Sequence, residues 1–434
     1  MMKTKLEFMF VPILVLLGIA LNDTLTASKS QRTLPPEEGC VFMTVMGEQS
    51  SKGFNRYKSN KNTQLAVRDG LQWLSKAQLP NGGFGAGSHA AQHIKDPHAV
   101  KADPATTAMV GMALLRSGVE LQTGDNAKSL GNALEYLLET IENIDANNPY
   151  ITEVRNTQIQ TKLGENIDAV LASQFLSNIL DRDLEGIDKK RIVRCLDICI
   201  DRIQDGTDEH GRQKGAGWAG VLQSGMANSA LEAAQTVGVS VNKDILENSR
   251  KYQKENFNDK DGSVNTEDGA GIVLYAVSGS VRASAKEARK ARIDIEKAKN
   301  EGKLPANAAV NAENLKEIGY TSGEAAKYGT AYNVYESAKQ TAQKDEVLDG
   351  FGNNGGEEFL SYLQTGESML VNKDEDWKNW YDNMSGRILK IQNQDGSWSG
   401  HHCITSPVFC TATSLLLLTV EEDIAFLQKM GEEE

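Results

Sequence analysis

The stretch QNQDGSWSGHHC, residues 392–403, is followed at once by the apolar segment ITSPVFCTATSLLLLTV. This order is typical of a helix end, a glycine turn closed by an aromatic residue, a loop with two histidines and a cysteine, and a buried helix. A second copy, QLPNGGF at residues 78–84, precedes a loop with three histidines and the segment DPATTAMVGMALLRSG. Both copies read Gln, three residues, Gly, one residue, aromatic. A motif repeated with its flanking helices predicts a repeat architecture.

Amphipathic and apolar helical segments alternate along the chain from Leu65 onward. The first amphipathic segment ends at the Pro80–Gly83 turn, and the first apolar helix opens at Asp103-Pro104, a cap followed by a proline. A helix that is apolar all round belongs inside, whereas an amphipathic helix lies at the surface. The alternation predicts an all-α fold, an α/α toroid of about six hairpins with inner and outer helices. The later segments that carry the pattern are 132–144 with 164–180, 187–204 with 215–238, 245–257 with 267–280, and 356–370 and 376–392 with 406–420.

The ends of the chain differ from this pattern. Lys3 and Lys5 precede an apolar run, Phe8–Leu21, and a polar segment with Ala27 as a plausible cleavage point, the layout of a secretory signal. We expect export to the periplasm or the medium, with an uncleaved membrane anchor as the alternative. The expected regions are a signal peptide (1–27), an irregular arm (28–62), the toroid (63–280 and 350–420), a helical insertion rich in Ala, Lys and Glu (281–349) and an acidic tail (421–434).

Charge limits the partners. The 434 residues carry a net charge of −13, and 40% are hydrophobic, which allows a large core. Nucleic acid is excluded because no dense basic face is available. A small-molecule ligand is expected, and no partner subunit is indicated. Cys195 and Cys199 share the apolar face of one helix and are predicted to be buried, whereas Cys403 and Cys410 are either a disulfide or free thiols.

The repeated QNQDGSW and QLPNGGF resemble the QW motif of the squalene cyclase and protein prenyltransferase superfamily. The phrases DPHAVKADPATTAMVGMALLRSG, LQSGMANSALEAAQ, FGNNGGEEFLSYLQTGES and DGSWSGHHCITSPVFCTATSLLLL are similar to exported bacterial prenyltransferase or squalene oxidase repeat proteins. The resemblance covers roughly residues 65–280 and 350–420. It implies the toroid and an isoprenoid ligand at the barrel mouth, but it brings no established reaction.

The motifs that would define that superfamily's chemistry are missing. Neither DRDLE (181–185) nor KDEDW (373–377) fits the DxDD motif of alkene-protonating cyclases, and no DDxxD motif is present for magnesium diphosphate. The Asp-x-Cys and downstream His that hold zinc in protein prenyltransferases cannot be placed on this sequence one by one. The motifs therefore indicate a fold and leave the reaction open.

Five of the six histidines lie in the loops that follow the two motifs. A closed toroid makes the first and last repeats neighbours, so these loops are expected to meet. Imidazoles beside a thiol favour zinc. The alternatives are helix capping or chance, and acid/base chemistry without a metal. The candidate metal ligands are His89, His93, His98, His401, His402 and Cys403.

Polar residues mark the starts of the inner helices, which should gather at one mouth of the barrel. Capping accounts for any one of them alone, but a ring of carboxylates and amides is a site candidate. Asp168, Glu357 and Glu358 are the candidate catalytic residues. The other polar or aromatic residues of this set are Asp103, Thr107, Glu165, Asn166, Trp218, Asn228, Glu267, Asp268, Asn353 and Asn354.

Three functions remain open from the sequence. The first is an isoprenoid site at the mouth, with or without zinc. The second is a carbohydrate-active enzyme of the lyase or hydrolase type, which needs an acid/base pair and aromatic platforms. The third is a binding or scaffold protein without catalysis, favoured if packed side chains plug the mouth.

Overall fold

The computed structural model describes residues 59–124, 126–182, 186–352 and 354–432. The predicted signal peptide, or its membrane-anchor alternative, and most of the predicted arm (28–62) lie outside these residues. The described chain is helical and contains isolated β-bridges but no sheet. None of the described helices combines the length and the apolar character needed to span a membrane.

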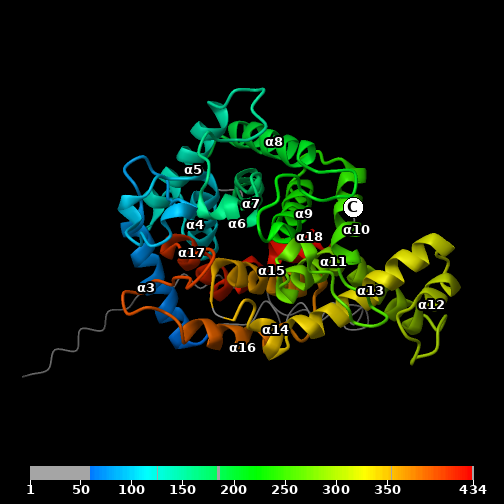
Figure 1. Cartoon of the computed structure of the whole chain (residues 1–434). Coiled ribbons are helices and arrows are strands. Elements are labelled where there is room, and N and C mark those ends of the chain that lie inside the picture. Colours follow the sequence, from blue (N-terminus) through cyan, green and yellow to red (C-terminus); the bar gives the residue numbers. More distant parts are fainter. Residues whose placement is uncertain (1–58, 125, 183–185, 353, 433–434) are drawn as a thin grey trace, which may run out of the picture. The chain divides into compact units, whose positions relative to one another are not determined.

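Six helices of the described chain form a closed inner ring (Figure 1). Each packs against the next in chain order, and the last, α17, packs against the first, α4. These helices are buried on nearly every side, as their uniformly apolar sequences require. They are α4 (Pro104–Arg116), α7 (Ile167–Asp181), α9 (Gly220–Thr236), α11 (Val273–Asn300), α15 (Gly356–Asn372) and α17 (Pro407–Leu418).

An outer helix precedes each inner one and packs against the ring. Outer helices bury one face only, as α8 does with Ile192, Cys195 and Cys199. The predicted α/α toroid and the predicted burial of both cysteines are therefore confirmed. The outer helices are α3 (Lys61–Ala77), α5 (Ala127–Glu142), α8 (Lys189–Asp205), α10 (Lys243–Glu255), α13 (Ser322–Ala342) and α16 (Trp377–Leu389).

Short elements occupy the connections. Among the described residues they are the 3-10 turns η1 (His89–Ala91), η2 (Pro97–Ala99), η3 (Glu267–Gly269) and η4 (Val420–Asp423), and the helices α6 (Gln158–Leu163), α12 (Ala312–Glu317), α14 (Asp345–Leu348) and α18 (Ile424–Met430).

The region predicted as an insertion (281–349) is organised differently. Its expected boundary falls in the middle of α11, whose first half belongs to the inner ring. The second half of α11 extends beyond the ring, and α13 packs along it as its outer partner. The composition hid this continuity because alanines, together with Ile295, form the buried face of α11 there. A second small core contains Ala291, Ile295, Ala298, Leu304, Leu315 and Ala325.

The predicted acidic tail (421–434) is also different. Its described part forms the end of η4 and then α18, which buries Ile424, Phe426, Leu427 and Met430 and packs against α15 and α9. The acids of the sequence hid four buried apolar side chains, whose spacing suits a short amphipathic helix. This segment covers the end of the ring at which the inner helices finish.

The inner helices run in the same direction. The starts of α4 and α7 are joined because Ala105 N donates to Asp168 Oδ1 (3.0 Å), and toward the other end of the ring arginines of α4 and α11 bind backbone carbonyls of α17 and α15. Arg116 Nη1 donates to Leu416 O (3.1 Å), and Arg289 Nη1 donates to Val371 O (3.2 Å). The carboxylate in the first turn of α7 matches the helix dipole, and Arg116 at the other end is paired with Glu367 and Asp423.

Candidate functional site

We define the mouth of the ring as the surface formed by the loops that lead into the six inner helices. At this mouth, hydrogen bonds join the loops of the first and last repeats. Gln92 Nε2 donates to Cys403 O (2.9 Å), and Lys95 Nζ donates to Thr405 O (2.8 Å). The buried Gln158 amide donates to Ala86 O (2.9 Å) and accepts from Thr405 N (2.8 Å). The two histidine-bearing loops therefore meet, as ring closure predicts.

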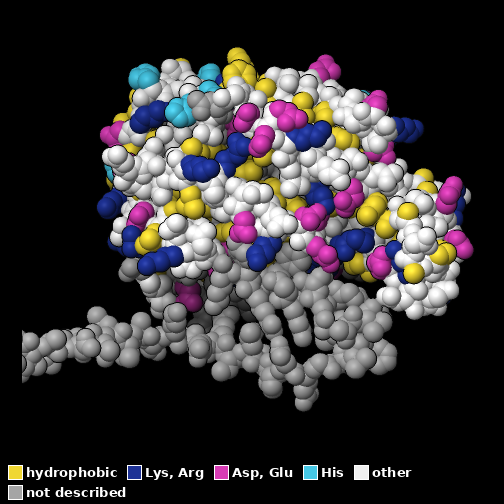
Figure 2. Space-filling model, turned by 90° about the horizontal axis from the view of Figure 1, so that it is seen from below, with side chains coloured by type: hydrophobic (Ala, Val, Ile, Leu, Met, Phe, Trp, Pro, Cys, Tyr) yellow, Lys and Arg dark blue, Asp and Glu magenta, His cyan; other side chains and the backbone are white. Residues whose placement is uncertain are grey.

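The histidines themselves are spread along this contact, and Figure 2 shows histidine side chains gathered along one edge of the face it displays. His89 Nδ1 lies 2.6 Å from Gln92 Nε2, and His402 Nε2 lies 4.0 Å from Glu358 Oε2. His93, His98 and His401 are exposed. In the part of the chain that the structure describes, no three His, Cys, Asp or Glu side chains are placed to hold one metal ion. The zinc site stays a prediction.

Cys403 and Cys410 are free thiols. Cys410 is buried, and its Sγ donates to Ile404 O (3.5 Å). Burial and then the neighbouring Glu357 raise the pKa of the Cys403 thiol to about 12. Because the thiolate is the reactive and metal-binding form, this environment does not activate Cys403 as a nucleophile.

Glu357 and Glu358 form a buried carboxyl pair in the first turn of α15. Glu357 Oε2 accepts from Ile404 N (3.1 Å), and Glu358 Oε1 accepts from Phe351 N (3.1 Å) and from the Tyr275 hydroxyl. Burial, and then the charge of Glu358, raise the pKa of Glu357 to about 8. At neutral pH Glu357 therefore carries a proton that it can donate.

Asp168 joins helices at the same mouth. Its Oδ1 accepts from Ala105 N and its Oδ2 accepts from Gln160 Nε2 (2.6 Å), so both oxygens are engaged. Asp103 caps α4 by accepting from Thr106 N (2.7 Å), and burial and then Asp168 raise its pKa to about 7. Burial also raises the pKa of Asp168. This geometry gives Asp168 a role in positioning α4 against α7.

Lys162 and Trp218 form a second feature of the mouth. Lys162 Nζ lies 4.2 Å from the centre of the Trp218 ring, a cation–π contact. Lys162 is only 5% exposed, whereas Trp218 is 66% exposed. Lys162 also acts electrostatically on Glu357 and Cys403, so it lies near the carboxyl pair.

Phe351 is the other strongly exposed aromatic residue of the mouth, at 60%. Its ring centre lies 5.1 Å from that of His402, which in turn approaches Glu358. The mouth thus presents one exposed aromatic ring beside Glu358 and another, through Lys162, near Glu357. A single exposed aromatic ring needs no explanation, so what distinguishes these two is their place beside a buried carboxyl pair.

The other residues predicted at the starts of the inner helices do not join the carboxyl pair. Glu165 accepts from the Tyr150 hydroxyl (2.5 Å), and Asp268 accepts from the Tyr252 hydroxyl (2.6 Å). Asn228 lies inside α9 and not at its start, which corrects the sequence-based placement. Asn353 lies outside the described residues.

Three residues of the site were missed by the sequence reasoning: Lys162, Tyr275 and Phe351. Lys162 stands in the polar–apolar stretch QIQTKLGEN, and Tyr275 stands inside the apolar GIVLYAV. A lysine or tyrosine within an otherwise apolar segment could have indicated these positions, because such side chains are rarely buried unless their polar group has a partner.

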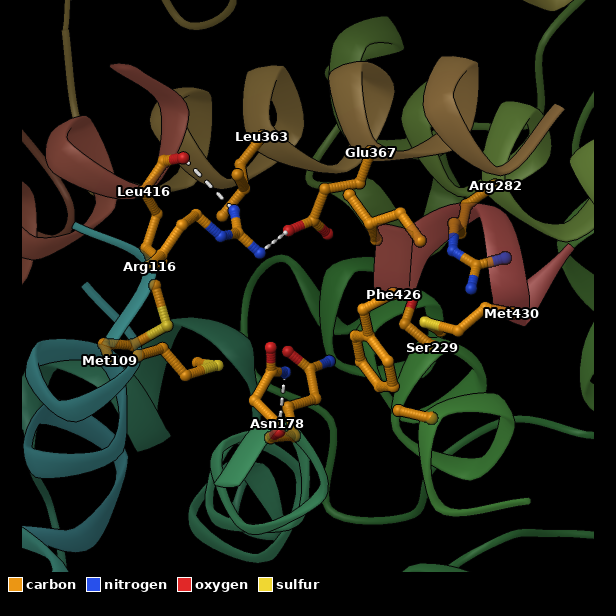
Figure 3. A pocket seen from close by; sticks show the side chains of 14 residues that line it. Met109, Arg116, Asn178, Ser229, Arg282, Leu363, Glu367, Leu416, Phe426 and Met430 are labelled. Atoms are coloured by element: carbon orange, nitrogen blue, oxygen red, sulfur yellow. Dashed lines mark hydrogen bonds and ion pairs between the residues drawn. The ribbon is translucent and has the colours of Figure 1, made fainter. Parts of the chain in front are cut away.

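The cavity that the described residues form inside the ring is small. A cavity of about 30 Å³ is lined by side chains from all six inner helices and from α18 (Figure 3). Arg116 spans it to reach Glu367 (2.7 Å), and Phe426 and Met430 of α18 close it. This volume holds about one water molecule. An isoprenoid chain has no room in this cavity, so ligand binding is best sought at the mouth.

Comparison with known proteins gives no family for this chain. No family model and no curated protein matches it. Solved structures titled glycosidase, one of them in complex with glucose, match over 85% of this chain and 100% of theirs at 12% identity, with TM-scores of 0.42. The class that the described residues define is an all-α protein built as an α/α toroid.

Proposed function

We propose that the mouth binds a saccharide and cleaves a glycosidic bond, with Glu357 as the proton donor. One observation carries this proposal: a buried carboxyl pair, one member of which keeps its proton at neutral pH, has an exposed aromatic ring near each member, Phe351 by way of His402 and Trp218 by way of Lys162. It meets both requirements that the sequence set for a carbohydrate-active site, an acid/base pair and aromatic platforms.

The aromatic rings supply binding. Sugar rings have apolar C–H faces, and flat exposed side chains such as Trp218 and Phe351 match them. Both residues lie in loops that lead directly into inner helices, so the ring holds them in place. A bound sugar chain that contacts both rings passes the carboxyl pair.

Glu357 supplies the proton. Its acidic hydrogen passes to the glycosidic oxygen as the bond from that oxygen to the sugar carbon breaks, a water molecule forms the new bond to that carbon, and Glu358 accepts the proton that this water releases. Glu357 is only 1% exposed, covered by the loop 400–405. Cleavage therefore requires this loop to move.

The burial of both carboxyls also favours a second candidate, a saccharide-binding protein without catalysis. Both candidates use Trp218 and Phe351 to bind the sugar. Only the enzyme requires the loop 400–405 to move so that Glu357 can reach the bond. Product formation separates them.

The test is a panel of soluble polysaccharides offered to the purified protein, with binding measured by calorimetry and cleavage by new reducing ends. Trp218→Ala should weaken binding about tenfold or more, because stacked aromatic contacts contribute on the order of 1 kcal/mol or more. Glu357→Gln should keep binding and lose cleavage by about 10²–10⁴-fold. Glu375→Gln, an exposed acid away from the mouth, is the matched control. Absence of saccharide binding, or binding unaffected by Trp218→Ala, would overturn the proposal.

The isoprenoid ligand and the zinc ion implied by the sequence remain separate proposals. Metal analysis of the protein as isolated tests the second: about one zinc per chain, lost when His401 and His402 are both changed to alanine, is the expected result. Unchanged stability in a chelator together with metal-free protein would contradict it.

A further inference from the structure

Lys162 is a buried cation that the folded chain leaves incompletely coordinated. Its ammonium group offers three hydrogen-bond donors. Within the described ranges, the contact of Nζ is the face of Trp218, and no carboxylate oxygen lies within 4 Å of it. The aromatic face of Trp218 engages the positive charge but accepts at most one of the three N–H groups, so water or another oxygen from outside the chain has to accept the rest. An anionic oxygen from outside the chain would complete the site.

The nearest acid does not serve this purpose. Glu357 is hydrogen-bonded to Ile404 N and is protonated at neutral pH, so it presents no full charge to Lys162. His89 is repelled, since Lys162 helps to lower the pKa of its imidazole after burial. Neither Glu357 nor His89 therefore neutralises the positive charge of Lys162 at the mouth.

The backbone fixes Lys162 beside Trp218. Ala219 N donates to Lys162 O (2.7 Å), and Gly217 N donates to Leu163 O (3.1 Å), so the two segments run side by side as a short paired ribbon. A Cβ atom at Gly217 would meet Lys162 C at 2.6 Å. Such close pairing holds the ammonium and the indole in one arrangement before any ligand arrives, which reduces the entropic cost of binding.

We infer that Lys162 and Trp218 form a subsite for a carboxylated sugar, a uronate unit whose carboxylate binds the ammonium while its ring packs against the exposed edge of the indole. This inference rests on the proposed saccharide site and names its substrate class. One face of the indole lies over Nζ, and most of the side chain is exposed, so a ring ligand has access to the indole. A ligand that uses both groups needs a flat apolar face and an anion a few ångströms apart, and a uronate has both.

The test compares uronate oligosaccharides, from pectate and alginate, with the same oligosaccharides after reduction of their carboxyl groups. The wild-type protein should bind the uronates about 10–100-fold more tightly, the gain expected of a charge-assisted hydrogen bond. Lys162→Met should remove this preference and leave binding of the reduced sugars unchanged. Lys162→Arg should restore part of it.

A second readout separates this role from a structural one. Because Lys162 makes no ion pair among the described residues, Lys162→Met should leave the melting temperature close to that of the wild type while affinity falls. A lower melting temperature would show that Lys162 stabilises the fold, and would overturn the inference. Equal affinity of the wild-type protein for uronates and reduced sugars would overturn it too, but would leave the saccharide site standing. No binding to either probe would overturn both. Inorganic phosphate at the same concentration should not compete with the uronates for binding. Competition would show that Lys162 binds anions in general, and would overturn the assignment of a uronate subsite.

Discussion

Gln392 Nε2 donates a hydrogen bond to the carbonyl oxygen of Ala66, which lies 326 residues earlier in the chain, at 3.0 Å. The same amide donates to Gly396 O (2.9 Å) and so closes its own turn. Gln78 repeats the arrangement, donating to Gly82 O (2.7 Å) and to Ser129 O (2.9 Å) on the next outer helix. The glutamine of the repeated motif is therefore a clasp between neighbouring outer helices, and Gln392 closes the ring.

Replacing Gln392 by alanine should destabilise the protein by about 2–4 kcal/mol, because two carbonyl oxygens lose their partner. Urea denaturation measures this change. Gln72→Ala, on the exposed side of α3, is the control and should shift the midpoint by much less. A Gln392→Ala protein as stable as the control would show that packing of Trp398 alone closes the ring.

The ring could be predicted from the sequence because the spacing of apolar residues indicates how much of each helix is buried, and the fully buried helices are the inner ones. It failed where composition conceals a buried face. Alanines hide the second half of α11, which extends beyond the ring, and the acids around Ile424 hide α18. The second half of α11 has few large apolar residues, and in α18 the four large apolar residues stand in a segment too short and too acidic to be recognised as a core helix.

The candidate site was predictable in place but not in content. Helix direction and ring closure placed Glu357, Glu358 and the histidine loops at one mouth. The partners that give each group its chemistry come from other repeats: Tyr275 reaches Glu358 over 83 residues, and Lys162 meets Trp218 through backbone pairing. Such contacts depend on side-chain packing, which no local pattern records.

Stability should fall as pH rises through the range set by Glu357. Its pKa in the folded protein, about 8, lies above its ordinary value of 4.5, so the unfolded chain binds fewer protons between these pH values. The stabilisation is complete below pH 4.5 and is lost as pH rises through 8, by on the order of a few kcal/mol. Glu357→Gln should flatten this dependence between pH 5 and 9, and denaturant titrations at each pH measure it. Asp103, with a pKa raised to about 7, should leave a residual slope.

The pH dependence of cleavage should follow the pH dependence of stability, and this comparison tests the role of Glu357 further. A proton donor with this pKa should support cleavage below about pH 8 and lose it above. Glu375→Gln should leave both profiles unchanged. An unchanged stability profile in Glu357→Gln would show that this carboxyl is ionised in the folded protein, which would remove it as the acid.

Asp423 should act as the latch of α18. Its carboxylate binds Arg116 (2.6 Å) and Arg182, and all three groups lie where the inner helices end. Asp423→Asn leaves the buried Arg116 and the partly exposed Arg182 short of negative charge, at a cost of about 3 kcal/mol, and should raise amide hydrogen exchange in residues 424–430. Lys429→Ala removes an exposed ion pair to Asp181 and should cost less than about 1 kcal/mol. Equal effects of the two changes would argue that apolar packing alone holds α18.

Gly217→Ala should separate the two halves of the Lys162–Trp218 subsite. The new Cβ atom would lie 2.6 Å from Lys162 C and 2.7 Å from Lys162 O, and these are backbone atoms that cannot rotate away. The paired segments must move apart, so we expect a loss of about 1–3 kcal/mol in stability and a weaker preference for carboxylated sugars. Gly131→Ala is the control, because it lies within α5 with no atom within 4 Å of its Cβ position, and it should stabilise the protein by about 0.5–1 kcal/mol. Calorimetric melting and sugar binding of both variants check this, and a Gly217→Ala protein that binds uronates as the wild type does would show that the subsite does not need this close pairing.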